Sequence, residues 1–250
     1  MASGTYRRGA GGKLDANKSY RFPEPHVYEE EYVYWPWGQL IEAACDLIAA
    51  RAPARALVID YMAGTGYLLD RLSRKRSDLR LHGVSLDGDH IAYGRRKYPH
   101  LTLIRADADS YVPEERPDVV VCTAGIHHLN RTSQRRFVRK VASELDRAAL
   151  FVVGEEVIRP YGKDDADRLA SVVELGTALI RHVADQKAPK AVLRAAIDML
   201  SNDVVESEYK LDMDELRALL SDDFIIRASQ RTWPEQHALY GDVLLECERL

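Results

Sequence analysis

Cysteine and long apolar runs are scarce in this sequence of 250 residues. Its three cysteines, Cys45, Cys122 and Cys247, are widely spaced and form no Cys-x-x-Cys pair, which argues against a zinc or disulfide framework and favours a reducing cytoplasm. No apolar run approaches the roughly 18 residues that a membrane-spanning helix needs. The first residues, MASGTYRRGAGGK, lack the apolar segment of a secretory signal. We therefore expect a cytoplasmic protein with no membrane partner.

An excess of positive charge is also missing. The formal net charge is −4, from 35 basic and 39 acidic residues, so there is no general electrostatic reason to bind nucleic acid. Basic clusters such as Arg74-Lys75-Arg76 and Arg95-Arg96-Lys97 fall in or next to predicted helices among acidic residues. Solvent-facing helix surfaces explain them better than a nucleic-acid interface, and we expect no nucleic-acid partner.

Strand-like and helical segments alternate through the middle of the chain. The predicted strands cover residues 56–60, 81–86, 101–105, 118–123 and 149–154, and the predicted helices cover 67–76, 89–97 and 131–145. The run Val119-Val120-Val121 is apolar without alternation, as in a central strand that is buried on both faces. This alternation predicts an α/β fold with a doubly wound, mostly parallel sheet.

The flanking segments have a different character. Residues 1–18 are rich in glycine, alanine and basic residues, which favours a flexible terminus. Residues 19–52 contain an aromatic arm and a predicted helix at 38–51, which together could form a lid. Residues 159–220 are predicted as a helical insertion, with a break at Ala188-Pro189 and a last helix at 212–220. Predicted strands at 224–229 and 238–246 then complete the sheet, so the core comprises 53–158 and 221–250.

The stretch VIDYMAGTGYLLDRL runs from the first predicted strand through a glycine turn into a helix. Gly64 and Gly66 allow a ligand to approach the backbone without a Cβ in the way. A dinucleotide loop would have a third glycine at the position of Leu69, and the lysine of a phosphate loop is absent. Asp60 is unsuited to a polyphosphate and suits a ligand with an ammonium group or hydroxyls. The loop therefore predicts a nucleoside-like cofactor without a polyphosphate.

Four segments, in the same order, resemble the class I S-adenosylmethionine-dependent methyltransferases. The family's apolar-apolar-Asp-x-Gly-x-Gly-x-Gly loop is similar to residues 58–66, and LTLIRADADSYVP is similar to its third strand with the following aspartate, here Asp107. RPDVVVCTAGIHHL resembles its fourth strand and loop, and the tail resembles its final antiparallel strand pair. The resemblance implies a seven-stranded sheet with an antiparallel last strand, S-adenosylmethionine as cofactor and S-adenosylhomocysteine as product.

Two positions depart from the family pattern. Met62 replaces the first loop glycine, which predicts an ordinary φ at that residue. Ser85 stands where many members have an acidic residue that binds the ribose. We expect Ser85 and Leu86 to line the ribose and adenine with help from Asp87, although Asp87 could equally cap the next helix. The residues expected to contact the cofactor are Arg21, Tyr32, Asp60, Ala63, Gly64, Gly66, Ser85, Leu86, Asp87, Asp107, Ala108 and Thr123.

Titratable side chains lie at the ends of the fourth and fifth strands. The candidates for catalysis are His127, His128, Glu155, Glu156 and, on the lid, Tyr28. Methyl transfer from a sulfonium is an in-line displacement, so the protein mainly positions the acceptor and needs a base only for a proton of high pKa. We expect one histidine to face the site and the other to bond within the core. We expect one glutamate to face the site and the other to be exposed or to pair with an arginine, although a purely structural role for these residues stays open.

No ligand spacing supports a metal site. A set made of His127, Glu155 and His237 lacks any such spacing, so we expect no metal. A lid and a helical insertion would enclose the acceptor, which favours a small molecule over a polymer and leaves a homodimer open.

The leading hypothesis is methyl transfer to a small molecule in a biosynthetic pathway. One alternative is a protein that binds the cofactor in a regulatory role or catalyses a cyclisation. The other is a nucleic-acid methyltransferase, which the acidic balance and the missing aromatic-Pro-Pro-aromatic motif disfavour. The sequence does not encode which atom accepts the methyl group.

Overall fold

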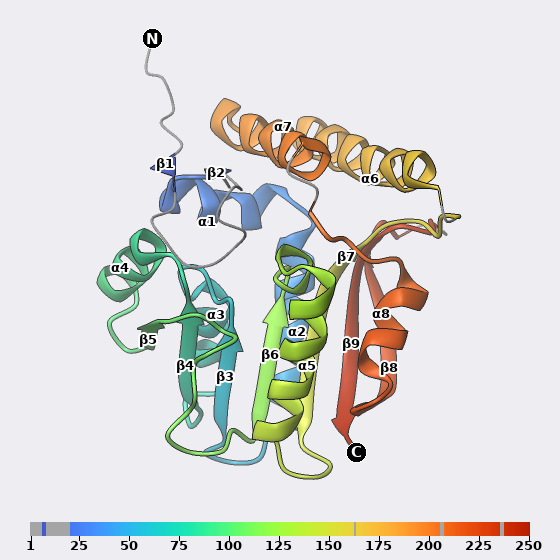
Figure 1. Ribbon diagram of the computed structural model, residues 1–250. Coiled ribbons are helices and arrows are strands. Elements are labelled where there is room, and N and C mark those ends of the chain that lie inside the picture. Colours follow the sequence, from blue (N-terminus) through green and yellow to red (C-terminus); the bar gives the residue numbers. More distant parts are fainter. Residues whose placement is uncertain (1–6, 9–20, 163, 206–207, 236–237) are drawn as a thin grey trace.

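The structure is a computed structural model that describes residues 7–8, 21–162, 164–205, 208–235 and 238–250 (Figure 1). The strands are β1 (Arg7–Arg8), β2 (Arg21–Phe22), β3 (Leu57–Tyr61), β4 (Arg80–Ser85), β5 (Thr102–Arg105), β6 (Val119–Thr123), β7 (Leu150–Val157), β8 (Phe224–Trp233) and β9 (Gly241–Arg249). The helices are α1 (Pro25–Tyr34), α2 (Trp37–Arg51), α3 (Tyr67–Lys75), α4 (Gly88–Lys97), η1 (Ile126–His128), α5 (Arg131–Glu144), α6 (Asp165–Asp185), α7 (Lys190–Val205) and α8 (Met213–Leu220). The predicted flexible segment 1–18 lies outside the described residues except for β1, which pairs with β2.

Seven strands form one sheet in the order β5-β4-β3-β6-β7-β9-β8. The strands from β3 to β7 are parallel to one another. Strand β9 is antiparallel to both of its neighbours, β7 and β8. The chain order reverses between β3 and β6, so a ligand is expected beyond the carboxyl ends of these two strands. The predicted doubly wound sheet with an antiparallel last strand is confirmed.

The apolar strands bury both faces of the sheet. Val119, Val120 and Val121 of β6 are fully buried, as their lack of alternation predicted. Helices α5 and α8 pack in the apolar cluster on one face, and α2 and α3 pack in the cluster on the other (Figure 1). Because helices cover both faces of the sheet, a site is expected at the strand ends.

Helices α6 and α7 lie across the carboxyl ends of the parallel strands, with α1 beside them (Figure 1). A third apolar cluster, which includes Trp35, Trp37 and Trp233, joins these helices to the sheet. Helix α8, which the sequence grouped with the insertion, instead packs against α5 and β8. The cover over the strand ends is therefore made by α1, α6 and α7.

Local signals explain several element ends. Asp212 and Glu215 form a capping box at the start of α8. Strand β7 continues to Val157, three residues past its predicted end, because Glu155, Glu156 and Val157 pair with β9.

Among the described residues, no helix combines the length and apolar character that crossing a membrane requires.

Candidate active site

Strand β3 ends in a buried carboxyl group that has no partner. Asp60 is 2% exposed, and its Oδ1 accepts no hydrogen bond from any described residue. Burial raises the pKa of this carboxyl well above its usual value. A buried acceptor without a donor is costly, so the site favours a ligand that brings a donor or a positive charge.

The turn after β3 differs from the prediction at Met62. We expected an ordinary φ there, but its φ is +64°, in the left-handed region. This conformation costs roughly 1–2 kcal/mol for a residue with a Cβ. Gly125 makes room for the side chain, since a Cβ at that glycine would lie 2.7 Å from Sδ of Met62. The methionine therefore adopts a backbone conformation that favours glycine and packs onto the loop after β6.

The two glycines of the turn face different neighbours. A Cβ on Gly64, which has a φ of +56°, would lie 2.7 Å from Oη and 2.8 Å from Cε1 of Tyr28. A Cβ on Gly66, which has a φ of +87°, would lie 2.9 Å from Cδ2 of Leu103 on β5. Gly64 therefore faces α1, the lid helix. Gly66 instead lies against β5, and the packing there leaves no room for a Cβ at this position.

Helix α1 places two tyrosines over this turn. Tyr28 and Tyr32 are four residues apart and share one helix face, with ring centroids 5.3 Å apart. The Tyr28 ring stacks on His90 at 4.7 Å, and the Tyr32 ring stacks on Tyr67 at 4.5 Å. Burial raises the pKa of both hydroxyls, which makes a proton-accepting phenolate unfavourable near neutral pH. Tyr28 is thus better suited to covering the site than to acting as a base.

The other residues expected at the cofactor surround the same strand ends. Asp87 caps α4 through Oδ1, which accepts the N–H groups of Asp89 at 2.8 Å and His90 at 2.9 Å. The capping role that the sequence left open is therefore present, and it uses only one of the two carboxylate oxygens. Asp107 accepts the N–H of Asp109 at 2.9 Å. Arg21 is placed in β2, and its side chain is outside the described part of the structure. The remaining residues are buried or half-buried: Ala63, Ser85, Leu86, Ala108 and Thr123.

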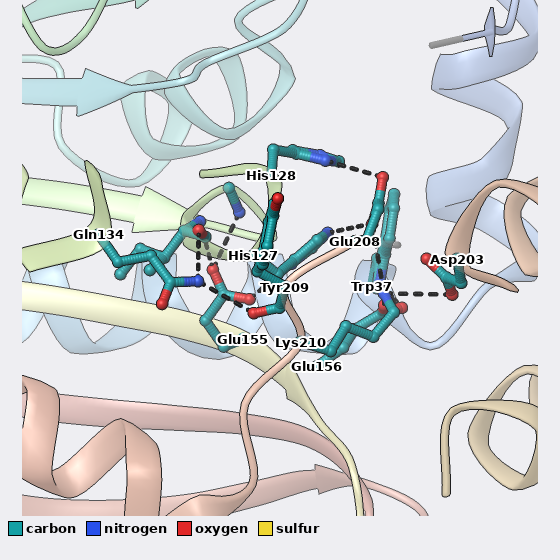
Figure 2. A network of polar contacts seen from close by, with 12 residues as sticks. Trp37, His127, His128, Gln134, Glu155, Glu156, Asp203, Glu208, Tyr209 and Lys210 are labelled. Atoms are coloured by element: carbon teal, nitrogen blue, oxygen red, sulfur yellow. Dashed lines mark hydrogen bonds and ion pairs between the residues drawn. The ribbon is translucent and has the colours of Figure 1, made fainter. Parts of the chain in front are cut away.

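His127 and Glu155 form a buried pair between the ends of β6 and β7 (Figure 2). Nδ1 of His127 lies 2.7 Å from Oε2 of Glu155. Oε1 of Glu155 accepts the N–H groups of Gly125 at 3.0 Å and Ile126 at 2.6 Å. Burial would raise the pKa of Glu155, but His127 and the N–H of Ile126 outweigh burial and hold it below its usual value. An ionised carboxylate only accepts, so Nδ1 carries the proton of this bond.

Glu208 brings the two histidines together. Its Oε1 lies 3.0 Å from Nδ1 of His128, and its Oε2 lies 3.5 Å from Nε2 of His127 (Figure 2). Burial would raise the pKa of Glu208, but His128 and His127 hold it well below its usual value. Burial would lower the pKa of His128, but Glu208 outweighs burial and raises it. The predicted division between the histidines is thus only partly seen, because both contact this carboxylate.

Glu156 is neither exposed nor paired with an arginine, which corrects the prediction. Its Oε1 accepts the indole N–H of Trp37 at 2.6 Å, and its Oε2 lies 2.5 Å from Nζ of Lys210 (Figure 2). Lys210 is fully buried and also lies 3.5 Å from Asp203 and 3.8 Å from Glu208. Burial would lower the pKa of Lys210, but Asp203 and Glu156 outweigh burial and raise it.

Two further carboxyl groups adjoin this network. Burial raises the pKa of Asp203, and the nearby charge of Glu208 adds to the effect despite Lys210. Burial and the charge of Glu156 raise the pKa of Asp242. Burial therefore shifts both groups toward their uncharged form, in contrast to Glu208.

Sequence reasoning missed Trp37, Asp203, Glu208, Lys210 and Asp242. The only signal was the polar alternation at 208, 210 and 212, which is typical of an extended, half-buried segment. The fold places this segment across η1, where the N–H of Tyr209 donates to the carbonyl of His127 at 2.9 Å. Gln134 of α5 reinforces the contact by donating to the carbonyl of Tyr209 at 2.9 Å.

Two surface hollows of about 400 Å³ each lie elsewhere. One lies beside α8 and β8, where Arg217 and Phe224 contribute to its walls. The other lies near the amino ends of β6 and β7, where Arg51 and Asp146 line it. Neither hollow includes the residues described above, so neither marks the site.

Residues 58–147, from β3 past the end of α5, match a family model described as a methyltransferase domain. This part of the chain is therefore similar to a methyltransferase domain. The match includes the glycine turn and both histidines, whereas Glu155, Glu208 and Lys210 lie beyond it. A comparison with curated protein sequences returned no significant match.

Solved structures of methyltransferases have the same fold as this chain. Magnesium protoporphyrin IX methyltransferase from Synechocystis PCC 6803, with bound SAM, aligns at 14% identity over 95% of this chain and 88% of its own, with a TM-score of 0.58. The N-methyltransferase NodS from Bradyrhizobium japonicum WM9, in complex with S-adenosyl-l-homocysteine, aligns at 11% identity over 95% and 94%, with a TM-score of 0.54. Mitomycin 7-O-methyltransferase MmcR aligns at 14% identity over 86% of this chain and 55% of its own, with a TM-score of 0.57. At these identities the likeness establishes the fold.

Proposed function

We propose that the chain transfers a methyl group from S-adenosylmethionine to a small molecule enclosed beneath α1, α6 and α7, as a step in a biosynthetic pathway. The unpartnered carboxyl of Asp60 carries the proposal. It lies beside the glycine turn at the reversal of strand order, where this fold is expected to bind ligands. Two of the structural neighbours bear on the cofactor, since one has SAM bound and the other S-adenosyl-l-homocysteine.

The described residues fit such a cofactor. Asp60 offers a buried acceptor to an ammonium group, and Gly64 offers backbone without a Cβ. Ser85, Asp87 and Asp107 follow the ends of β4 and β5 and supply oxygens for hydroxyl or amino groups. The remaining proposed contacts are Arg21, Tyr32, Ala63, Gly66, Leu86, Ala108 and Thr123.

The chain's own groups would hold the acceptor and exclude water. Bound S-adenosylmethionine supplies an electrophilic methyl group on a sulfonium. His127 and His128 face the acceptor end of the site, and Glu155 positions His127 by accepting its Nδ1–H. Glu156 braces Trp37 and Lys210, and Tyr28 covers the glycine turn.

Calorimetry with S-adenosylmethionine and S-adenosylhomocysteine tests the cofactor. We expect the wild type to bind both, and Asp60→Asn and Gly64→Val to lose binding while remaining folded by circular dichroism. Asp46→Asn, an exposed change on α2, serves as the control and should bind normally. A folded wild type that binds neither compound would overturn the proposal.

Methyl transfer is then followed by mass shift against pools of small metabolites and against RNA. A gain of one methyl group on a small molecule is the expected result. Cofactor binding without any transfer would favour the regulatory or cyclisation role. Transfer to RNA alone would favour a nucleic-acid methyltransferase.

A further inference from the structure

We infer that His127, His128 and Glu208 bind a divalent transition-metal ion at the carboxyl end of β6. Sequence spacing indicated no metal, because the third ligand comes from the linker between α7 and α8, 80 residues beyond His128. His237, the third residue considered from the sequence, lies outside the described residues.

The first argument is a pair of buried polar atoms that face each other. Nδ1 of His127 is engaged by Glu155, which leaves Nε2 of the ring to face Glu208. That atom lies 3.5 Å from Oε2 of Glu208, which has no hydrogen-bond partner among the described residues. Glu208 is 4% exposed, so bulk water does not solvate this oxygen. A buried carboxylate oxygen and a buried ring nitrogen that face each other at this distance are two ligand atoms available to one cation.

The second argument is the spacing of the ligand atoms. Metal–nitrogen bonds of about 2.0–2.1 Å in a tetrahedral site place neighbouring ligand atoms about 3.3 Å apart. The contacts of Glu208 with His127 and His128 measure 3.5 and 3.0 Å. One ligand atom from each of the three residues lies within 4.8 Å of the others. Small side-chain rotations would therefore complete a three-ligand site.

The third argument is the support behind the ligands. A histidine that binds a metal usually donates its other ring N–H to a carboxylate, as His127 does to Glu155. Two backbone N–H groups fix Glu155 in turn. Gln134 donates to the carbonyls of both Ile126 and Tyr209, which ties η1 to the segment that carries Glu208. The ligands are thus positioned before any ion arrives.

The donor set also selects the metal. Two imidazoles and one carboxylate suit Zn²⁺, Co²⁺ or Fe²⁺, whereas Mg²⁺ prefers oxygen ligands. Lys210 lies 3.8 Å from Oε2 of Glu208, but its charge is compensated by Glu156 at 2.5 Å. Three protein ligands leave a coordination position open. This step rests on the proposed function. The open position would take an oxygen or nitrogen atom of the methyl acceptor, so the two histidines would hold the acceptor through the metal ion.

Metal binding is tested on the full chain without cofactor or acceptor. The protein is stripped with a chelator and titrated by calorimetry with ZnCl2, CoCl2 and MgCl2, and bound metal per chain is counted by elemental analysis. We expect one Zn²⁺ or Co²⁺ per chain, a visible Co²⁺ ligand-field spectrum, and binding of Mg²⁺ at least about tenfold weaker.

Variants assign the ligands. Glu208→Gln and His128→Gln should each weaken Zn²⁺ binding more than about tenfold, and Glu155→Gln should weaken it about 10–100-fold through the orientation of His127. His128 has a side chain that is 27% exposed, so its variant is the least disruptive to folding. Asp46→Asn is the control, because this exposed carboxyl on α2 pairs with Lys75 and lies outside the network, and this variant should bind one ion normally.

No metal uptake by the folded wild type would overturn the site, as would equal uptake by the wild type and both ligand variants. Imidazole NMR that finds protons on both nitrogens of His127 at saturating Zn²⁺ would also overturn it, because a proton would then fill the gap. Calorimetry with S-adenosylmethionine on the same samples separates the two proposals. Cofactor binding without metal uptake refutes the metal site alone, and metal uptake without cofactor binding refutes the proposed function alone.

Discussion

Replacing Gly64 with alanine tests the contact between the lid and the glycine turn. At a φ of +56°, an alanine lowers the free energy of unfolding by roughly 1–2 kcal/mol. About 0.4–1 kcal/mol of this loss is offset, because alanine also reduces the conformational entropy of the unfolded chain. The new Cβ would also lie 2.7 Å from Oη of Tyr28, and such overpacking costs about 1–3 kcal/mol. The ring cannot yield freely, because His90 stacks on it at 4.7 Å. We therefore expect a total loss of about 1–5 kcal/mol, or roughly 2–20 °C in Tm for a chain of this size.

A double-mutant cycle isolates the lid contribution. Thermal and denaturant unfolding are measured for the wild type, Gly64→Ala, Tyr28→Ala and the double variant. Removing the ring should leave only the backbone cost of Gly64→Ala, so the two changes should couple by at least about 1 kcal/mol. Gly162→Ala is the control, since the nearest atom is 3.9 Å from the added Cβ, and it should change stability by less than about 0.5 kcal/mol.

Equal penalties for Gly64→Ala with and without Tyr28 would refute this reasoning. Such a result would mean that the ring does not rest on the turn in solution. The expected coupling would instead show that Tyr28 has to move before a ligand can touch Gly64, which makes α1 a gate for the site.

Three further changes probe the buried charges. The pKa of Asp60 is raised in the folded chain, so the native state loses stability as pH rises past the unfolded value. Asp60→Asn should therefore raise the apo Tm near neutral pH, with a gain that vanishes below about pH 4; a lower Tm at both pH values would contradict this. Lys210→Met leaves Glu156 unpaired and should cost about 3–5 kcal/mol in unfolding experiments, with partial recovery when Glu156→Gln is added; no recovery would argue against their pairing. Asp87→Ser keeps a helix cap and should hold the free energy of unfolding within about 0.5 kcal/mol, whereas Asp87→Ala should lose about 1 kcal/mol. Both Asp87 variants should bind S-adenosylmethionine at least about tenfold more weakly, and unchanged affinity in the serine variant would reduce Asp87 to a cap.

The sheet was predictable because its signals are local. The unbroken apolar run of β6 requires burial on both faces, and helical spacing between strands requires crossovers. The capping box at Asp212 likewise depends on residues three positions apart. Such patterns act over a few residues, so they can be read without knowing the fold.

The backbone of the glycine turn was less predictable. The sequence placed Asp60 and Gly64 together, but an ordinary φ at Met62 was the wrong expectation, since its φ is +64°. That conformation depends on Gly125, which lies 63 residues away and leaves space for the methionine. A strained residue is tolerated only where distant packing accommodates it.

The sequence alone determined the α/β fold, the order of its elements and the strand ends at which chemistry is placed. Only the tertiary structure decided which charges meet there. It brought Glu208 and Lys210 from a linker to the ends of β6 and β7, and it buried Glu156 against Trp37. The physical reason is the distance along the sequence over which each interaction acts. Helices and turns are stabilised by residues close together in the chain, whereas the pairing of buried charges depends on which distant segments pack together away from water.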